Sequence, residues 1–244
     1  MAVIRSIARR ELQSYFATPL AYVFIVIFLA LAGLFTFYLG GFYERGQADL
    51  APFFNFHPWL YLFLVPAIAM RLWAEERKSG SVELLMTLPV TLWQAVLGKF
   101  LAAWLFIAVA LALTFPLWIT VNYLGEPDNG VIVATYLGSL LMAGAFLAIG
   151  SCISAANRNQ VVAFIITVVI CFLFMLAGFP LVLDFFSGWL PGQLLDGVGG
   201  LSFLTHYAAI SKGVLDLRDV LYFVLVIVVW LLATTIVLDL KKAD

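Results

Sequence analysis

Charged residues are scarce in this sequence. Asp, Glu, Lys and Arg make up 11% of its 244 residues, whereas 64% are hydrophobic, and the mean hydropathy is +1.08. So little polar surface cannot cover a water-soluble globule of this size, which excludes a soluble domain and favours a chain solvated by lipid. The net charge of −1 is uninformative as a total, so the placement of the charges must indicate the topology.

The motifs of catalysis and nucleotide binding are missing as well. No G-x-x-x-x-G-K-[ST] loop is present, so this chain cannot hydrolyse ATP through a P-loop. No carboxylate pair, His/Cys cluster or Ser-His-Asp set converges, and we expect no catalytic residue, no metal and no cofactor in this chain. Cys152 and Cys171 lie in apolar runs, which is typical of small buried side chains. His206 has no partner base or nucleophile, which favours an interfacial polar anchor over a catalytic site.

Long apolar runs dominate what is present. A helix needs about 20 apolar residues to cross a bilayer core about 30 Å thick, because only helices and closed barrels satisfy every backbone polar group in lipid. One apolar run, 58–74, is short and contains Arg71, which can extend to the interface near the helix end. The sequence predicts an all-α membrane protein, one transmembrane domain over 1–244 with six transmembrane helices. These spans are 20–41, 58–74, 100–124, 131–156, 161–183 and 220–238.

The distribution of Lys and Arg predicts the orientation. With six spans and a cytoplasmic N-terminus, ten basic residues lie inside and three outside, a clear positive-inside bias. We therefore expect both termini in the cytoplasm, N-in/C-in. Because the span interiors contain no ionisable side chain, a proton-coupled transporter is disfavoured, although unwound backbone could still bind sodium. The inner residues are Arg5, Arg9, Arg10, Arg71, Arg77, Lys78, Lys99, Arg158, Lys241 and Lys242, and the outer ones are Arg45, Lys212 and Arg218.

Two further segments are apolar but do not read as spans. In residues 1–19, apolar side chains fall on one helical face with arginines largely opposite. This pattern predicts an N-terminal interfacial helix whose Arg5, Arg9 and Arg10 face anionic headgroups, and a frayed basic tail is the alternative. Residues 184–219 are too apolar for a solvated loop and too interrupted by Gly and Pro for a span, which indicates an outer re-entrant segment.

The fourth span is rich in small residues spaced four apart. Such spacing lets helix backbones approach closely and predicts packing against other helices, either within the chain or across a dimer. The pairs are Ala134/Gly138, Ser139/Ala143, Gly144/Ala148 and Gly150/Ser154.

The cytoplasmic segment 75–99 combines charges with an apolar centre. A short helix is predicted to begin near Glu83, whose charge favours a helix N-terminus, and to end at Pro89. Thr91 and Gln94 then form a capping-box pattern that opens the next helix. An exposed apolar face on the short helix would mark a partner site, and the alternative is a helix lying along the inner leaflet. That face consists of Val82, Leu85 and Met86.

Residues 75–100, "EERKSGSVELLMTLPVTLWQAVLGKF", resemble the signature that follows the second span in permeases of type-2 ABC exporters. The stretch "ISKGVLDLRDVLYF" is similar to the corresponding region of the gliding-motility-type subfamily. The resemblance extends over essentially the whole chain and is silent on substrate. It implies that residues 4–16 form the interfacial elbow helix and that the cytoplasmic segment docks into a partner ATPase. The residues expected to carry this coupling are Glu75, Glu76, Gly80, Val82, Glu83, Leu85, Met86 and Pro89.

The resemblance also implies partners. We expect a multi-pass permease subunit of an ATP-driven ABC exporter in the bacterial cytoplasmic (inner) membrane, working with a second permease copy or a homologous permease. Two cytoplasmic ABC ATPase subunits would hold ATP and Mg. An additional membrane or periplasmic subunit is left open, and no nucleic-acid partner is expected. The alternative is a non-transporting membrane anchor or scaffold that recruits a cytoplasmic partner through the same helix.

Overall fold

All regular structure in the described part of the chain is helical. The computed structural model describes residues 2–80, 90–187 and 192–241, and no strand occurs within these ranges. The N-terminal part contains α1 (Ala2–Phe16), α2 (Pro19–Leu34), the π-helix η1 (Phe35–Leu39), α3 (Ala51–Asn55), α4 (His57–Ala69) and α5 (Ala74–Ser79). It is followed by α7 (Leu92–Ala112), α8 (Phe115–Leu124), α9 (Asn129–Ala156), α10 (Gln160–Leu176), α11 (Pro180–Ser187), α12 (Gly192–Gly199), α13 (Phe203–Ile210) and α14 (Leu217–Leu240).

Capping side chains fix where the long helices begin. Thr91 and Gln94 form a reciprocal capping box at the start of α7, which confirms that prediction. Asp128 accepts hydrogen bonds from the first backbone N–H groups of α9, and Asn159 does the same for α10. Asp216 caps α14. Each cap satisfies N–H groups that have no partner inside the helix.

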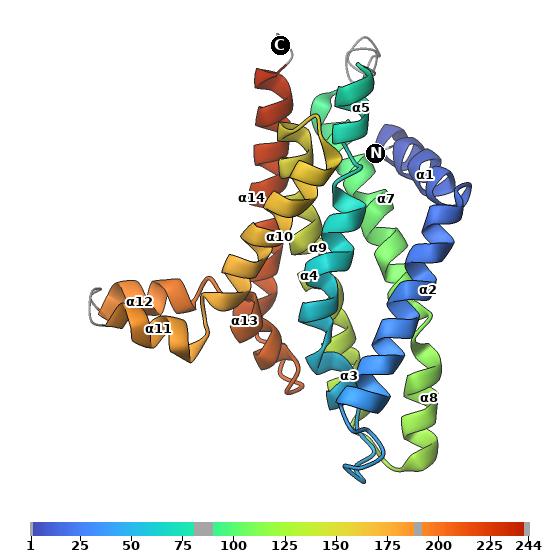
Figure 1. The fold of residues 1–244 in the computed structure, drawn as a ribbon, viewed down its shortest axis with the longest axis vertical. Helices are drawn as coiled ribbons and strands as arrows, with labels where there is room; N and C mark the ends of the chain where they lie inside the picture. The colour runs from blue at the N-terminus through green and yellow to red at the C-terminus, as the bar shows by residue number, and fades with distance from the viewer. Residues whose placement is uncertain (1, 81–89, 188–191, 242–244) are drawn as a thin grey trace.

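Helix α9 forms the centre of the bundle, with α4, α7, α10 and α14 packed around it (Figure 1). Its small residues make this possible. A Cβ added to Gly150 would lie 2.4 Å from the Cβ of Ala69 on α4, and one added to Gly138 would lie 2.7 Å from Ile210 on α13. Such distances leave no room for a side chain. The close packing predicted for the fourth span is therefore confirmed at these positions, and it occurs within the chain.

Four helical stretches in the described ranges are long and apolar enough to cross a membrane: Pro19–Leu39, Leu92–Leu124, Asn129–Ala156 and Leu217–Leu240. The prediction of an all-helical membrane protein is confirmed. The two other predicted spans correspond to shorter helices. Helix α4 has 13 residues and α10 has 17. Both of these helices nevertheless pack against α9.

The structure divides several predicted segments. The stretch 58–74 contains a break, because α4 ends at Ala69 and α5 begins at Ala74. The stretch 161–183 also divides, since α10 ends at Leu176 and Pro180 begins α11, a position where proline favours a new helix. In the predicted outer segment, α11 and α12 pack against each other and project sideways from the bundle (Figure 1).

Candidate functional site

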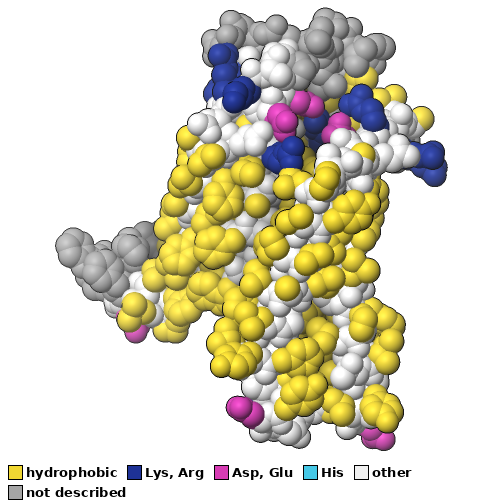
Figure 2. All heavy atoms as spheres, turned by 45° about the vertical axis from the view of Figure 1, so that its right-hand side comes forward, with side chains coloured by type: hydrophobic (Ala, Val, Ile, Leu, Met, Phe, Trp, Pro, Cys, Tyr) yellow, Lys and Arg dark blue, Asp and Glu magenta, His cyan; other side chains and the backbone are white. Residues whose placement is uncertain are grey.

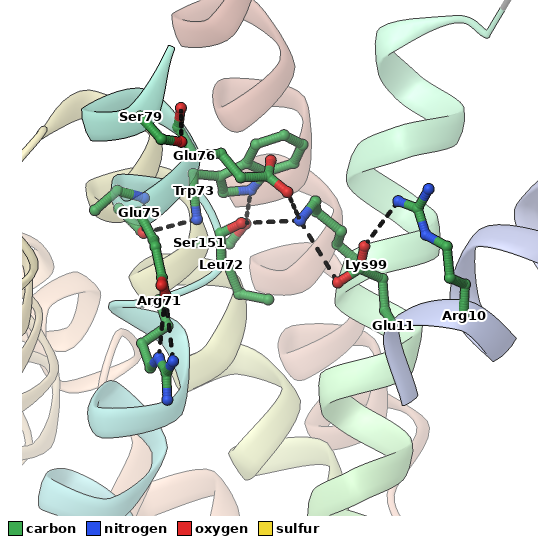
Figure 3. Close-up of polar contacts among 12 residues, drawn as sticks. Arg10, Glu11, Arg71, Leu72, Trp73, Glu75, Glu76, Ser79, Lys99 and Ser151 are labelled. Carbon is green, nitrogen blue, oxygen red and sulfur yellow. Dashed lines mark hydrogen bonds and ion pairs between the residues drawn. The ribbon is translucent and has the colours of Figure 1, made fainter. Parts of the chain in front are cut away.

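Three helices meet around Lys99 at the end of the bundle where both termini lie (Figure 1). Lys99, on α7, is 4% exposed. Its Nζ lies 2.6 Å from Oε1 of Glu76 on α5 and 3.6 Å from Oε2 of Glu11 on α1. It also donates a hydrogen bond of 3.2 Å to the Leu72 carbonyl oxygen (Figure 3). We call Glu11, Glu76 and Lys99 the Lys99 cluster. The ammonium has three N–H donors, and three acceptors surround it.

Trp73 positions the other side of this cluster. The Lys99 ammonium lies 5.1 Å from the centre of the Trp73 ring, within the range of a cation–π interaction. The ring is fully buried, and its Nε1 donates a hydrogen bond of 3.1 Å to Ser151 Oγ on α9 (Figure 3). The Lys99 cluster is therefore attached to the central helix of the bundle as well as to α1, α5 and α7.

Ser154 holds the break between α4 and α5 in place. Its Oγ accepts hydrogen bonds from the backbone N–H groups of Trp73 and Ala74, at 3.1 and 3.0 Å, and donates one of 2.8 Å to the Met70 carbonyl. One buried hydroxyl thus satisfies three backbone groups that the end of α4 and the start of α5 would otherwise leave unpaired. From the sequence, Ser154 is recognisable only as a small residue, because its partners lie about 80 residues earlier.

Helix α5 is the described part of the predicted coupling segment that precedes residues 81–89. Glu76 lies in the Lys99 cluster, and Glu75 forms an ion pair of 3.3 Å with Arg71 (Figure 3). Arg77 Nη1 donates a hydrogen bond of 2.7 Å to the Ala155 carbonyl of α9. Gly80 ends the helix with a φ of +73°, in the left-handed region that glycine occupies most easily.

The other five residues predicted to carry coupling have no described position. Val82, Glu83, Leu85, Met86 and Pro89 lie outside the described residues, so their roles stay predictions.

Helix α1 packs its apolar face against α7. A Cβ added to Gly98 would lie 2.7 Å from the Ile7 side chain, and the rings of Tyr15 and Phe106 stack with centroids 5.5 Å apart. Burial, with a smaller contribution from the Glu11 carboxylate, raises the pKa of the Tyr15 hydroxyl above its ordinary value. The exposed face of α1 carries the predicted Arg5, Arg9 and Arg10, and Arg10 also pairs with Glu11 at 3.1 Å.

Sequence reasoning missed the Lys99 cluster, since Lys99 was counted only for topology and Glu11 was not considered. The one available signal is that Lys99 stands alone within an apolar helix, where a lysine requires a partner. His57 was missed as well. It begins α4, is fully buried, and its Nδ1 lies 2.7 Å from Ser139 Oγ.

His206 has partners that the sequence does not predict. Its Nδ1 lies 2.6 Å from Oδ1 of Asp219, and its Nε2 lies 2.9 Å from the Gly200 carbonyl oxygen. These contacts join α13 to the start of α14. Both cysteines are buried free thiols, as predicted. Among residues 2–80, 90–187 and 192–241, no three His, Cys, Asp or Glu side chains gather as metal ligands.

Comparison with known families decides the class. Residues 5–241 match the family model described as ABC-2 family transporter protein. This chain belongs to the ABC-2 transporter family. A comparison with curated protein sequences finds no match. As an ABC-2 family member, the chain is a multi-pass membrane permease subunit of an ABC transporter, a type of subunit that is generally non-catalytic and pairs with a separate ABC ATPase.

Proposed function

We propose that this ABC-2 permease couples ATP hydrolysis by two cytoplasmic ATPase subunits to the export of a substrate across the bacterial inner membrane. Two permease chains, identical or homologous, form the membrane part, and ATP and Mg are held by the ATPases. Closure of the ATPases acts on residues 81–89 and tilts the attached helices as rigid bodies. The gliding-motility-type subfamily is the proposed subfamily.

The Lys99 cluster is the observation that supports this coupling most strongly. Residues 81–89 connect α5 directly to α7, so a displacement of this segment acts on both helices. The cluster joins Glu76 of α5 to Lys99 of α7 and to Glu11 of α1. Because Lys99 is buried, these ion pairs are less screened by water and salt than surface pairs. A push on the segment is therefore shared among α1, α5 and α7.

The proposed topology has six spans with both termini in the cytoplasm. Of the two helices shorter than a full span, α4 is mostly buried against its neighbours, and α10 packs one face against α9. At the end that holds both termini, acidic and basic side chains gather above a continuous apolar surface, as expected where spans leave the membrane (Figure 2). The amphipathic α1 lies at this boundary as the interfacial helix, with its arginines on the exposed face.

The test replaces one apolar residue of the proposed coupling helix. The tagged chain is purified from its native membranes in mild detergent together with its ATPase, and ATP hydrolysis is measured after reconstitution in liposomes. Leu85→Asp should insert normally, since it touches no span, but should lose the ATPase or its hydrolysis, because a charge in a docked apolar face would be buried without a partner. Glu83→Ala tests a separate point, whether this carboxylate pairs with a basic group on the ATPase or only caps the helix. A capping role costs at most about 1 kcal/mol and leaves coupling largely intact.

Two outcomes would change the proposal. If the Leu85→Asp variant purifies with a fully coupled ATPase, residues 81–89 do not form the docking helix. If the ATPase binds the wild-type chain but its hydrolysis never depends on the chain, the anchor or scaffold function is correct instead.

A further inference from the structure

A pocket of about 380 Å³, open to the outside on one side, lies beside the Lys99 cluster and is lined by residues of α1, α2, α4, α5 and α7. One part of its wall is apolar and includes Ala21, Phe24, Ile68 and Phe106. Leu20, which is 51% exposed, also lines the cavity and extends its apolar wall to the outer surface of α2. The cavity is thus amphipathic and continuous with the surface that faces lipid.

The polar part of the wall contains groups that still lack a partner. Arg71 uses its Nε and Nη2 on Oε2 of Glu75 at 3.3 Å. Within the described part of the chain, Arg71 Nη1 and Glu75 Oε1 have no hydrogen-bond partner, and neither do the hydroxyls of Ser14 and Tyr15. All four residues line the cavity. Lys99 lines it as well, but three acceptors already surround its ammonium. The available groups are therefore one cationic donor, one anionic acceptor and two hydroxyls.

We infer that this cavity binds the headgroup of an ethanolamine phospholipid from the membrane, with the phosphate on Arg71 and the primary ammonium on Glu75. Arg71 Nη1 donates to a phosphate oxygen, a charge-assisted hydrogen bond. The ammonium donates to Glu75 Oε1 and to the hydroxyls of Ser14 and Tyr15. The acyl chains follow the apolar wall past Leu20 into the bilayer.

The charges of the cavity select among headgroups. Its lining has two cations, Arg71 and Lys99, and three carboxylates, Glu11, Glu75 and Glu76. This excess of negative charge disfavours an anionic headgroup such as phosphatidylglycerol. A choline headgroup has the same net charge as ethanolamine, but its nitrogen carries no N–H and leaves the Glu75 oxygen unpaired. Ethanolamine matches both the cation and the carboxylate of the wall.

Lipid titrations of the purified chain, read by native mass spectrometry, test this assignment. The full-length chain is stripped of lipid in detergent and titrated separately with dioleoyl phosphatidylethanolamine, phosphatidylcholine and phosphatidylglycerol. We expect one molecule of the ethanolamine lipid to bind at least about tenfold more tightly than the other two, the factor that corresponds to one charge-assisted hydrogen bond. Soluble phosphoethanolamine, the same headgroup without acyl chains, should not displace it at equal concentration.

Arg71→Gln and Glu75→Gln should each abolish this preference. Arg45→Gln is the matched control. Arg45 forms an exposed i,i+4 ion pair with Asp49 of the same 3.3 Å length, and this pair lies outside the cavity. Ala67→Phe should also lose the bound lipid, since the new ring fills the cavity without changing its charge. Arg71 is partly exposed, so its variant tests the site even if Ala67→Phe fails to fold.

Three results would overturn the inference. Equal affinity for the three lipids would indicate a non-selective lipid layer. An unchanged preference in Arg71→Gln would place the lipid elsewhere. Displacement by equimolar phosphoethanolamine would assign the cavity to a free metabolite. The inference depends only on membership of a membrane family. Lipid binding can therefore fail while ATPase coupling holds, and ATPase coupling can fail while lipid binding holds.

Discussion

Replacing Lys99 with Met should destabilise the protein through the charges that it leaves behind. Met retains an unbranched apolar stem, so the cavity created is small. The carboxylates of Glu76 and Glu11, with side chains 27% and 20% exposed, would then face each other without the ammonium. Removing one partner of a buried ion pair costs about 3–5 kcal/mol. Because both carboxylates keep some contact with water, we expect a loss of about 3 kcal/mol, at the low end of this range.

The assay is reversible unfolding of the purified chain in mixed detergent micelles, followed by tryptophan fluorescence. The double variant Lys99→Met with Glu76→Gln should be more stable than Lys99→Met alone, since it removes one of the two carboxylates that faced the ammonium. Lys212→Met is the control, because Lys212 is exposed and such substitutions usually change stability by less than about 0.5 kcal/mol. A Lys99→Met variant as stable as this control would show that the ammonium does not stabilise the two carboxylates.

Three further predictions follow from helix packing and surface charge. Gly150→Ala should lower the free energy of unfolding by about 1–3 kcal/mol, because its Cβ would lie 2.4 Å from a side-chain carbon of α4. Gly33→Ala is the control, since a Cβ there would have nothing within 4 Å and should not destabilise the protein. Ser154→Ala should cost about 1–3 kcal/mol in the same assay by leaving two backbone N–H groups unpaired. Arg9→Glu with Arg10→Glu should weaken the seating of α1 on anionic lipid, where each basic residue is worth about 1 kcal/mol, so transport activity should fall more than expression does. Unchanged activity in both anionic and neutral liposomes would mean that α1 is only a basic tail.

The sequence predicts most of the helices because their signals are local. The start of α7 depends on Thr91 and Gln94, three residues apart, and the small residues of α9 repeat within one helix. Apolar length and the distribution of Lys and Arg are also readable without a structure. These features specify a helical membrane protein and the end of the bundle that carries most of the basic residues.

The contacts that build the candidate site are not local. Lys99 pairs with Glu11, which lies 88 positions earlier in the sequence, and with Glu76, which lies 23 positions earlier. No pattern in one sequence connects these residues. The break after α4 was missed because Ser154, which satisfies its backbone groups, lies on another helix. Charge pairing and backbone satisfaction are long-range requirements, whereas hydropathy is a property of each segment.

The most direct test of ATPase coupling is site-specific photocross-linking in native membranes. A benzoylphenylalanine placed at Ser79, the last residue of α5, lies next to the proposed docking segment. Ultraviolet light should join this position to the ABC ATPase subunit, and Leu85→Asp should abolish the product. The same probe at Asp128, at the start of α9 on the opposite end of the bundle, should give none (Figure 1). An ATPase adduct from Asp128 but not from Ser79 would contradict the proposed orientation and the docking site together.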